Sequence, residues 1–566
     1  MLGRPRVREI EQECTQCRKS DRCEAYHQQV PFSGNYAFDL MVEVGLARFR
    51  DRRQDAEILK QLQERWGLDL PSSSVGLLAD SFLDGLAAVH RTYAPKLRQR
   101  LQNDGGFVIH VDGTCEAGTD VLFTAIAEPR GWVLEVAKMA TENTDDICTL
   151  MRQCQLQFGD PLGVVRDLSS NIAQATAEVF PTARDLICHY HFLENVGEKL
   201  CEKWHGKLTS CLRRVKIYPA LRSIRHELVR WSRKGPNLSQ KQIEQWLTNP
   251  AAVAGENTIA LRRFIAYTAL RWLDDYKSDL QGEYFPFDLP QLAFYRRAMK
   301  LEEMLRELVS REDFPHRELP TLKTISGHLT TLRNDAEVVA TASRLEKAAS
   351  QFEALREVLR LTSRPGQSLL RQHEPSGDGQ NATVAEKLRA SLEQFRTGLE
   401  QQKSCEDDEH KRADQAIVLE YLEKYKEKLV GHVFDLPGET QLIARRTNNP
   451  VEHHFGAEKQ GLRRKLGVKK LTHHFQTLRA EVLLVRNLSN PDYLAIVLDG
   501  ELSNLPAKIA ECWSTAQALR KARQQTDRNH PMPTTKRQLR EPNLLDTLHE
   551  MIDEAIKTAM PKSNAA

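Results

Sequence analysis

Two aspartates of this sequence each follow a short apolar run, a placement that can support metal chemistry. Asp112 follows the run FVIHV and precedes Gly113, and Asp167 follows LGVVR after a further 167 − 112 = 55 residues. An apolar run of this length that ends at a turn residue predicts a buried strand. A carboxylate at the end of such a strand is held rigidly by the sheet, while the adjoining loop leaves it open to solvent. Both side chains are therefore candidate ligands for a metal ion.

The residues around these aspartates predict an order of three strands, helix, strand, helix, strand. Asn143 or Thr144 is suited to cap the first helix. The order resembles a ribonuclease-H-like nuclease core, in which two acids so placed lie on neighbouring strands. Taken singly, each aspartate is also explained as a turn residue or a cap. Two of the five predicted strands end at Asp112 and Asp167, and the other three span residues 121–127, 131–138 and 185–189. The predicted helices span 145–158 and 170–180.

A third acid, Glu452, lies at a predicted helix start in RRTNNPVEHHFGAEK, residues 445–459. Asn449 can cap the free amides of this helix, Pro450 suits its first position, and Glu452 follows in the first turn. An acid there is also explained by its favourable interaction with the helix dipole. Glu458 is the alternative candidate for the third acid.

These features together resemble the catalytic core of DDE transposases, particularly the Mutator-like and hAT-like cut-and-paste group and its bacterial insertion-sequence relatives. That group has a Cys or Asp, two residues and a His after the second aspartate, as Cys188-His-Tyr-His191 has here. The segment that carries the last catalytic acid in these transposases resembles residues 447–465 here, where TNN is followed by a short spacer, Glu452 and a basic helix. In these proteins a long helical insertion separates the two parts of the core. The resemblance covers roughly residues 105–192 and 440–490.

The resemblance implies that Asp112, Asp167 and Glu452 hold two Mg²⁺ ions. Carboxylates suit this role because Mg²⁺ prefers oxygen ligands, and Mn²⁺ is expected to substitute for it. It implies strand cleavage and strand transfer at the ends of a mobile element, by a protein that binds double-stranded DNA and forms a homo-oligomer. One ion would activate water or a 3′-hydroxyl, and the other would stabilise the leaving oxygen. Cys188 and His191 are expected to shape the site around the second aspartate. The alternative is a transposase-derived protein that binds specific DNA sequences without catalysis.

The N-terminal segment, residues 1–35, contains four potential zinc ligands. Its first two cysteines have the Cys-x-x-Cys spacing of zinc sites, and a tetrahedral site needs four ligands. A small segment without its own core gains its fold from such an ion. The alternative is a flexible leader with reduced cysteines and one chance histidine. The predicted structural Zn²⁺ ligands are Cys14, Cys17, Cys23 and His27.

Residues 36–100 show helical spacing throughout. One helix is predicted over 55–66, Gly67 stops it, and a second begins after Pro71. A helix, a short turn and a helix predict a helix-turn-helix-like DNA-binding domain. An ordinary helical hairpin is the alternative, because Asp80 and Asp84 on the second helix would be repelled by phosphates.

Residues 441–480 are strongly basic, with nine Lys or Arg against two acids, a net charge of 9 − 2 = +7. Such a face is often only solvated, but beside a metal site it suits a phosphodiester substrate. The residues that we expect to contact DNA are Arg445, Arg446, Lys459, Arg463, Arg464 and Lys465.

The remaining long segments are predicted to be helical. Residues 196–440 carry Leu, Arg, Glu and Lys at three- and four-residue spacing, which predicts a helical insertion domain. Residues 441–490 are expected to return to the core, and 491–566 to form a helical tail. The tryptophans of the insertion are expected to be core residues, although one of them could stack on a displaced base. They are Trp204, Trp231, Trp246 and Trp272.

The composition is that of a globular protein with several domains: 566 residues, 40% apolar, 28% charged, and a net charge of only +3. No apolar run approaches the roughly 18 to 20 residues of a membrane span, and no apolar segment follows the N-terminal charges. We therefore expect a cytoplasmic protein without a membrane partner, associated with the nucleoid if it is bacterial. The predicted fold is an α/β ribonuclease-H-like core (101–195) with a large all-α insertion, after N-terminal zinc-binding and helix-turn-helix-like segments.

Overall fold

The structure is a computed structural model that describes most of the chain. In its N-terminal segment, β1 (Gln12–Glu13) pairs antiparallel with β2 (Ser20–Asp21). The predicted zinc ligands lie outside the described residues: Cys14, Cys17, Cys23 and His27. The described residues are 12–13, 20–21, 28–31, 34–234, 244–245, 247–249, 259–312, 314, 317, 319–359, 381–437, 441–529 and 543–559.

The chain forms two compact units. Unit 1 contains residues 1–186, 434–444 and 448–566, and unit 2 contains residues 187–433 and 445–447. Segments from both ends of the sequence therefore build unit 1.

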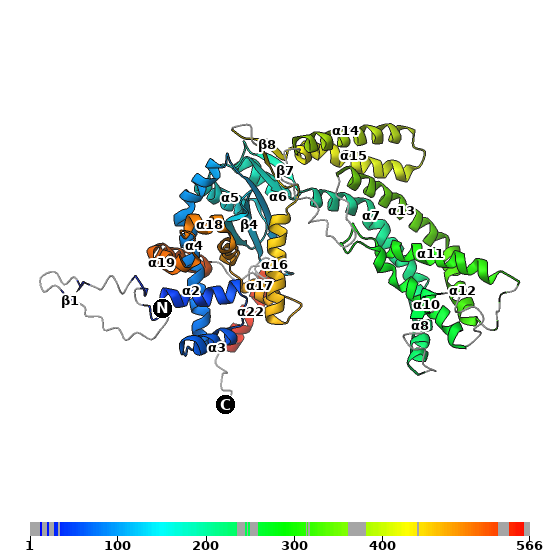
Figure 1. Ribbon diagram of the computed structural model, residues 1–566, viewed down its shortest axis with the longest axis horizontal. Coiled ribbons are helices and arrows are strands. Elements are labelled where there is room, and N and C mark those ends of the chain that lie inside the picture. The colour runs from blue at the N-terminus through cyan, green and yellow to red at the C-terminus, as the bar shows by residue number, and fades with distance from the viewer. Residues whose placement is uncertain are drawn as a thin grey trace, which may run out of the picture. The chain divides into compact units, whose positions relative to one another are not determined.

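A mixed five-stranded sheet is the framework of unit 1 (Figure 1). Its order is β5-β4-β3-β6-β7, in which β3, β4 and β5 form an antiparallel meander and β6 lies parallel to β3. The predicted order of strands and helices is confirmed, but two boundaries differ. The first strand does not end at Asp112 and continues to Thr114, because Gly113 and Thr114 still pair with the next strand. Residues 188–189 begin a helix and do not continue the last strand. The elements are β3 (Val108–Thr114), β4 (Val121–Glu128), β5 (Trp132–Met139), α5 (Thr144–Phe158), β6 (Gly163–Arg166), α6 (Ser170–Val179) and β7 (Arg184–Ile187).

Both faces of the sheet are covered, so its strands alternate between two apolar clusters. Ile109 and Val111 of β3 face the main core, which includes α5 and α6. Val108 faces a smaller cluster with Val165 of β6 and Phe434 of the hairpin β8 (Val433–Asp435) and β9 (Gln441–Ile443). Successive side chains of a strand point to opposite faces, which explains this division. It also places Asp112 on the same face as Val108.

The long helix α4 (Ser72–Asn103) is a core element of unit 1. Phe82 and Leu86 are fully buried, and the helix packs against α2, α5 and the C-terminal helices. It follows α3 (Asp55–Trp66) after Gly67, whose positive φ of 62° provides the predicted turn. The helix, turn and helix are thus present, while a role in DNA binding stays a prediction.

The C-terminal segments complete the core around α4. Asp84 of α4 is 4% exposed and pairs with Arg479 at 2.7 Å and Arg523 at 2.6 Å, so this acid stabilises the fold. Residues 472–477 and 480–489 form two separate helical elements, because Leu478 and Arg479 between them have extended backbone. The other described helices of unit 1 are α2 (Phe38–Gly45), the π-helix η1 (Leu46–Arg50), α16 (Asn449–Leu466), α17 (Thr472–Thr477), the 3-10 helix η5 (Ala480–Ser489), α18 (Pro491–Val497), the 3-10 helix η6 (Leu502–Asn504), α19 (Leu505–Glu511), α20 (Trp513–Asn529) and α22 (Leu544–Ala559).

Unit 2 is mainly helical in its described part from α7 to α15, as the sequence predicts. A buried ion pair between Arg344 and Asp414 joins α13 to α15, and the Arg344 guanidinium lies 5.0 Å from the Trp204 ring centroid. Trp204 therefore packs within the unit. No helix in the described part of the chain is long and apolar enough to span a bilayer. The helices are α7 (His189–Arg214), α8 (Ile217–Lys234), α10 (Ile259–Asp274), η3 (Asp275–Asp279), α11 (Pro290–Val309), α12 (Pro320–Asn334), α13 (Ala336–Leu359), α14 (Asn381–Cys405) and α15 (Glu409–Val430).

His90 connects α4 to the sheet inside the core of unit 1. Its Nε2 lies 2.9 Å from the Leu134 carbonyl oxygen of β5, and its Nδ1 lies 3.0 Å from the Tyr493 hydroxyl of α18. Burial lowers the pKa of His90 from 6.5 to about 4, because a charged imidazole would lose its hydration. The folded protein therefore holds this side chain neutral.

We expect unit 1 to lose stability as the pH falls from about 6.5 to about 4. The unfolded chain takes up a proton on His90 in this window and the folded chain does not, which removes about 3 kcal/mol of unfolding free energy. The measurement is urea unfolding of the wild type and of His90→Gln across this range. The variant should be less stable at pH 7 but should show a shallower decline toward pH 4. Equal slopes for the two proteins would contradict the assignment.

Candidate functional site

The register of the parallel strands β3 and β6, continued beyond its last pair, places Asp112 of β3 level with Asp167, which directly follows β6. The β3–β6 register pairs Val108 with Gly163 and His110 with Val165, an offset of 163 − 108 = 55 residues. The two aspartates have the same offset, 167 − 112 = 55, so each lies two residues beyond the last register pair. Neighbouring strands are about 4.8 Å apart, and residues level in a parallel pair point to the same face. The fold therefore brings the two predicted acids together.

The backbone around each aspartate is held firmly. Asp112 is 8% exposed, and its Oδ1 accepts a hydrogen bond from Gly113 N at 2.8 Å. Asp167 Oδ1 accepts from Ser169 N at 2.9 Å, and Arg166 donates to the Asp167 carbonyl at 2.8 Å. Arg166 is only 2% exposed, and it also makes a two-bond pair with Asp185 of the next strand at 2.7 and 2.8 Å. This clamp fixes the end of β6 that carries Asp167.

Asn448 attaches the start of α16 to the end of β3. It is fully buried, its Nδ2 donates to the Val111 carbonyl at 3.0 Å, and its Oδ1 lies 3.3 Å from His110 Nδ1. The Val111 carbonyl lies just beyond the last β3–β6 pair, so β6 does not donate a hydrogen bond to it. The Asn448 amide provides that donor. His110 is also buried, with its Nε2 2.8 Å from Glu128 Oε2.

The predicted cap of α16 is wrong by one residue. Asn448 occupies the N-cap position, makes no side-chain cap bond, and is followed by Asn449 and Pro450 inside the helix. The Asn448 side chain cannot cap because it is used on β3. Glu452 lies in the first turn of this helix, as predicted, and is half-buried. Docking of Asn448 thus holds the Glu452 turn next to the strand that carries Asp112.

Glu458, the alternative third acid, has a structural partner. Its Oε1 accepts from Arg52 at 2.9 Å, and Arg52 also donates to the Ala457 carbonyl at 2.8 Å. Burial raises the pKa of Glu458, and the charge of Arg52 opposes that rise. Because Glu458 is already paired with Arg52, Glu452 is the better candidate for the third acid.

Glu142 is a fourth acid at this site, and it is not among the acids predicted from the sequence. A Cβ atom on Gly113 would lie 2.1 Å from Glu142 Oε1, so the carboxylate rests directly on the residue after Asp112. Asn171 of α6 donates to its backbone carbonyl at 2.6 Å. Burial raises the pKa of Glu142, and the negative charge of Asp167 raises it further. The only local signal was the Asp112-Gly113 pair, because glycine is what this close approach requires.

The three predicted acids do not form a compact single-ion site. Among the described residues, Asp112, Asp167 and Glu452 do not bring one oxygen each to within 4.8 Å of the others. Two-ion sites are wider, because the ions lie about 3.5–4 Å apart and each Mg–O bond adds about 2 Å. Acids on the outer sides of two ions are thus separated by up to about 8 Å, and an all-oxygen donor set suits Mg²⁺.

The six predicted DNA-binding residues differ in their surroundings, and their contact with DNA stays a prediction. Lys459 donates to the Cys115 carbonyl at 2.8 Å, and Arg463 pairs with Glu116 at 3.0 Å, so both brace the turn after β3. Arg464 is exposed, and Lys465 is half-buried in a cavity described below. Arg445 and Arg446 belong to unit 2, where Arg446 donates to the Leu359 carbonyl at 3.0 Å.

The Cys-x-x-His motif begins helix α7 of unit 2. Cys188 is fully buried at the N-cap position, and His191 is half-buried in the first turn. Between them, His189 has its Nε2 2.7 Å from the Leu429 carbonyl oxygen, and its backbone N–H donates to the Arg446 carbonyl at 2.8 Å. The motif therefore contributes to the packing of its own unit.

No protein-family model matches the chain, and no curated protein matches its sequence.

We expect Asn448→Ala to loosen the start of α16, because it leaves the Val111 carbonyl buried without this donor. The cost should be on the order of 2 kcal/mol in unfolding free energy. Asn487→Ala is the matched control: Asn487 is also buried, and it exchanges two bonds with Val133 of β5 at 2.8 and 2.9 Å.

Hydrogen exchange separates the two variants. Both should unfold at lower urea concentration, but only Asn448→Ala should speed exchange at the amides of α16. Unchanged protection of α16 in Asn448→Ala would contradict the role of Asn448.

Proposed function

We propose that this protein is a DDE-type DNA transposase, in which Asp112, Asp167 and Glu452 hold two Mg²⁺ ions for strand cleavage and strand transfer. The observation that carries the proposal is the register of β3 and β6: continued two residues past its last pair, it places Asp167, just after β6, level with Asp112 inside β3. The attachment of the Glu452 turn to β3 through Asn448 supports it.

The sheet supports a ribonuclease-H-like core. Such a core has a meander of three strands with the next two strands added beside the first, which is the order β5-β4-β3-β6-β7. Two acids level with one another on neighbouring central segments, one inside β3 and one directly after β6, are the feature that this architecture and the proposed chemistry share.

The four acids of the site would have different roles in the proposed reaction. When bound, the two ions would activate the attacking water or 3′-hydroxyl and stabilise the leaving 3′-oxygen. Asp112 and Asp167, fixed by the sheet and the Arg166 clamp, would hold the ions at a constant spacing. Glu452 would complete the ligand set, and Glu142, beside Asp112, is placed to accept a hydrogen bond from a water in the ions' outer shell.

One site of this kind can carry out both reactions. In cleavage, an oxygen of water bonds to phosphorus, the bond to the 3′-oxygen breaks, and the nucleophile's proton passes to solvent. In transfer, the freed 3′-hydroxyl replaces water as nucleophile and a target strand provides the leaving oxygen. The substrate is therefore the double-stranded DNA at the ends of a mobile element, together with its target.

We expect Asp112→Asn, Asp167→Asn and Glu452→Gln each to lower cleavage and strand transfer by a factor on the order of 100 to 1,000, because each removes a ligand charge from the ions. The substrate is labelled DNA that carries the sequences flanking the gene, with Mg²⁺ or Mn²⁺ present. Asp145→Asn is the control, since Asp145 is an exposed acid on α5 and should leave activity unchanged.

DNA binding, measured on the same DNA by fluorescence anisotropy, should survive in all four variants. An Asp167→Ala protein as active as the wild type would end the assignment. A wild type that binds the DNA but never cleaves it with either metal would favour the catalytically inactive DNA-binding protein.

A further inference from the structure

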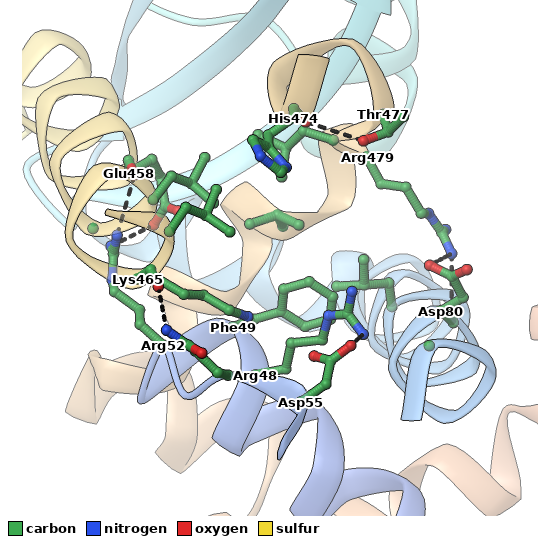
Figure 2. Close-up of a pocket in the computed structure, with 18 residues that line it drawn as sticks. Arg48, Phe49, Arg52, Asp55, Asp80, Glu458, Lys465, His474, Thr477 and Arg479 are labelled. Atoms are coloured by element: carbon green, nitrogen blue, oxygen red, sulfur yellow. Dashed lines mark hydrogen bonds and ion pairs between the residues drawn. The ribbon is translucent and has the colours of Figure 1, made fainter. Parts of the chain in front are cut away.

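Unit 1 contains a cavity of about 490 Å³ that is separate from the acids of the proposed active site (Figure 2). Elements distant in the sequence form its walls: η1, the start of α3 and α4 on one side, and the later turns of α16, α17 and η5 on the other. We call it the Lys465 cavity, after the lysine of α16 that lines it.

Arg52 fastens the two walls together. This residue has a left-handed backbone conformation, with φ of 59°, and its guanidinium lies across α16. A Cβ atom on Gly461 would be 1.3 Å from Arg52 Nη1, so glycine is required where the guanidinium crosses the helix. Gln54 adds a second link by donating to the Lys465 carbonyl at 2.8 Å. The cavity is therefore formed in advance of any ligand.

Most of the charges around the cavity are already paired. Arg48 Nη1 lies 3.2 Å from Asp55 Oδ2, Arg52 pairs with Glu458, and Arg479 pairs with Asp84. In the part of the chain that the structure describes, the Lys465 amino group has no ion-pair partner within 4.0 Å. The lining residues comprise four Lys or Arg and three acids, a net charge of 4 − 3 = +1.

The excess charge is concentrated where it is poorly solvated. Burial lowers the pKa of Lys465, and the positive charge of Arg48 lowers it further. Of the four cations, Lys465 and Arg48 thus repel one another. The charges of Asp55 and Glu57 partly offset this effect on Lys465, but only Arg48 forms an ion pair with Asp55. Arg48 directs Nη1 at Asp55, which leaves Nε and Nη2 as further donors. An anion between the two side chains would remove their repulsion and satisfy these donors.

Much of the remaining lining is apolar, although Gln54, His474 and Thr477 also contribute to it. Phe49 lies in the cavity wall in Figure 2, with Leu83 and Leu462 also among the lining residues. A ligand that fills such a space needs an anionic group at one end and a flat or apolar body at the other. A volume of this size suits a small organic molecule and exceeds what a single phosphate ion requires.

We propose that the Lys465 cavity binds a nucleotide, with Lys465 and Arg48 holding its phosphate and the apolar wall packing against its sugar and base. The nucleotide is either free in solution or part of a DNA strand. Binding of a nucleotide within a DNA strand rests on the proposed function, whereas binding of a free nucleotide does not.

The test measures binding by the full chain in the Asp112→Asn background without divalent metal, so that cleavage does not interfere. The probes are labelled deoxyadenosine monophosphate and a short labelled DNA duplex, with inorganic phosphate as competitor. Lys465→Met and Arg48→Met should weaken binding by about tenfold or more. Lys469→Met, which removes an exposed lysine just beyond α16, should leave binding unchanged.

The two probes distinguish the sources. Lys465-dependent binding of the mononucleotide identifies a free nucleotide, and a Lys465-dependent affinity for the duplex alone identifies DNA. Unchanged affinity for both probes in Lys465→Met overturns the proposal. Lys465-dependent binding by a wild type that never cleaves DNA would end the proposed function and leave this site standing.

A second measurement needs no variant. Acetylation of the wild type with acetic anhydride, read by mass spectrometry, should modify Lys465 less when the mononucleotide or the duplex is present. Labelling of Lys469 should stay the same with the mononucleotide. If neither probe protects Lys465, the cavity is not a nucleotide site.

Discussion

The architecture of unit 1 depends on one buried hydrogen bond, from the Asn448 amide to the Val111 carbonyl across 337 residues of sequence. A carbonyl at the end of a buried strand must find a donor, and β6 stops too early to supply one. Asn448 supplies it and so determines where α16 begins. The Glu452 turn, the brace formed by Lys459 and the α16 wall of the Lys465 cavity all follow from that position.

The same solution recurs at the outer strand of the sheet. Asn487 exchanges two hydrogen bonds with Val133, in the manner of a neighbouring strand, and Asn490 accepts from the Trp132 ring nitrogen at 3.2 Å. An exposed edge strand invites pairing with other chains, and covering it prevents this. Buried amide side chains therefore join the late part of the sequence to both β3 and β5, and they make one core from segments at the two ends of the chain.

The acids of the candidate site differ in how far the sequence could predict them. Asp112 and Asp167 follow apolar runs, a local signal, and the parallel register then explains their spacing of 55 residues. The start of α16 was predicted almost correctly, but its cap was assigned to Asn449, because a cap is judged from local backbone chemistry and Asn448 is occupied by a distant strand. Glu142 has no signal in its own surrounding sequence, and the glycine after Asp112 does not say which side chain the fold brings against it.

By itself, the sequence determined the strands and helices around the sheet, the position of Asp167 directly after its strand and the helical nature of the long middle segment. These follow from periodicity and turn chemistry, which act over a few residues. Only the tertiary structure decided that Glu458 serves Arg52, that the basic residues after Glu452 divide between braces and a cavity, and that Arg52 needs Gly461 beneath it. These roles come from contacts between side chains that are hundreds of residues apart in the sequence. Such contacts, and the burial that accompanies them, exist only in the folded chain.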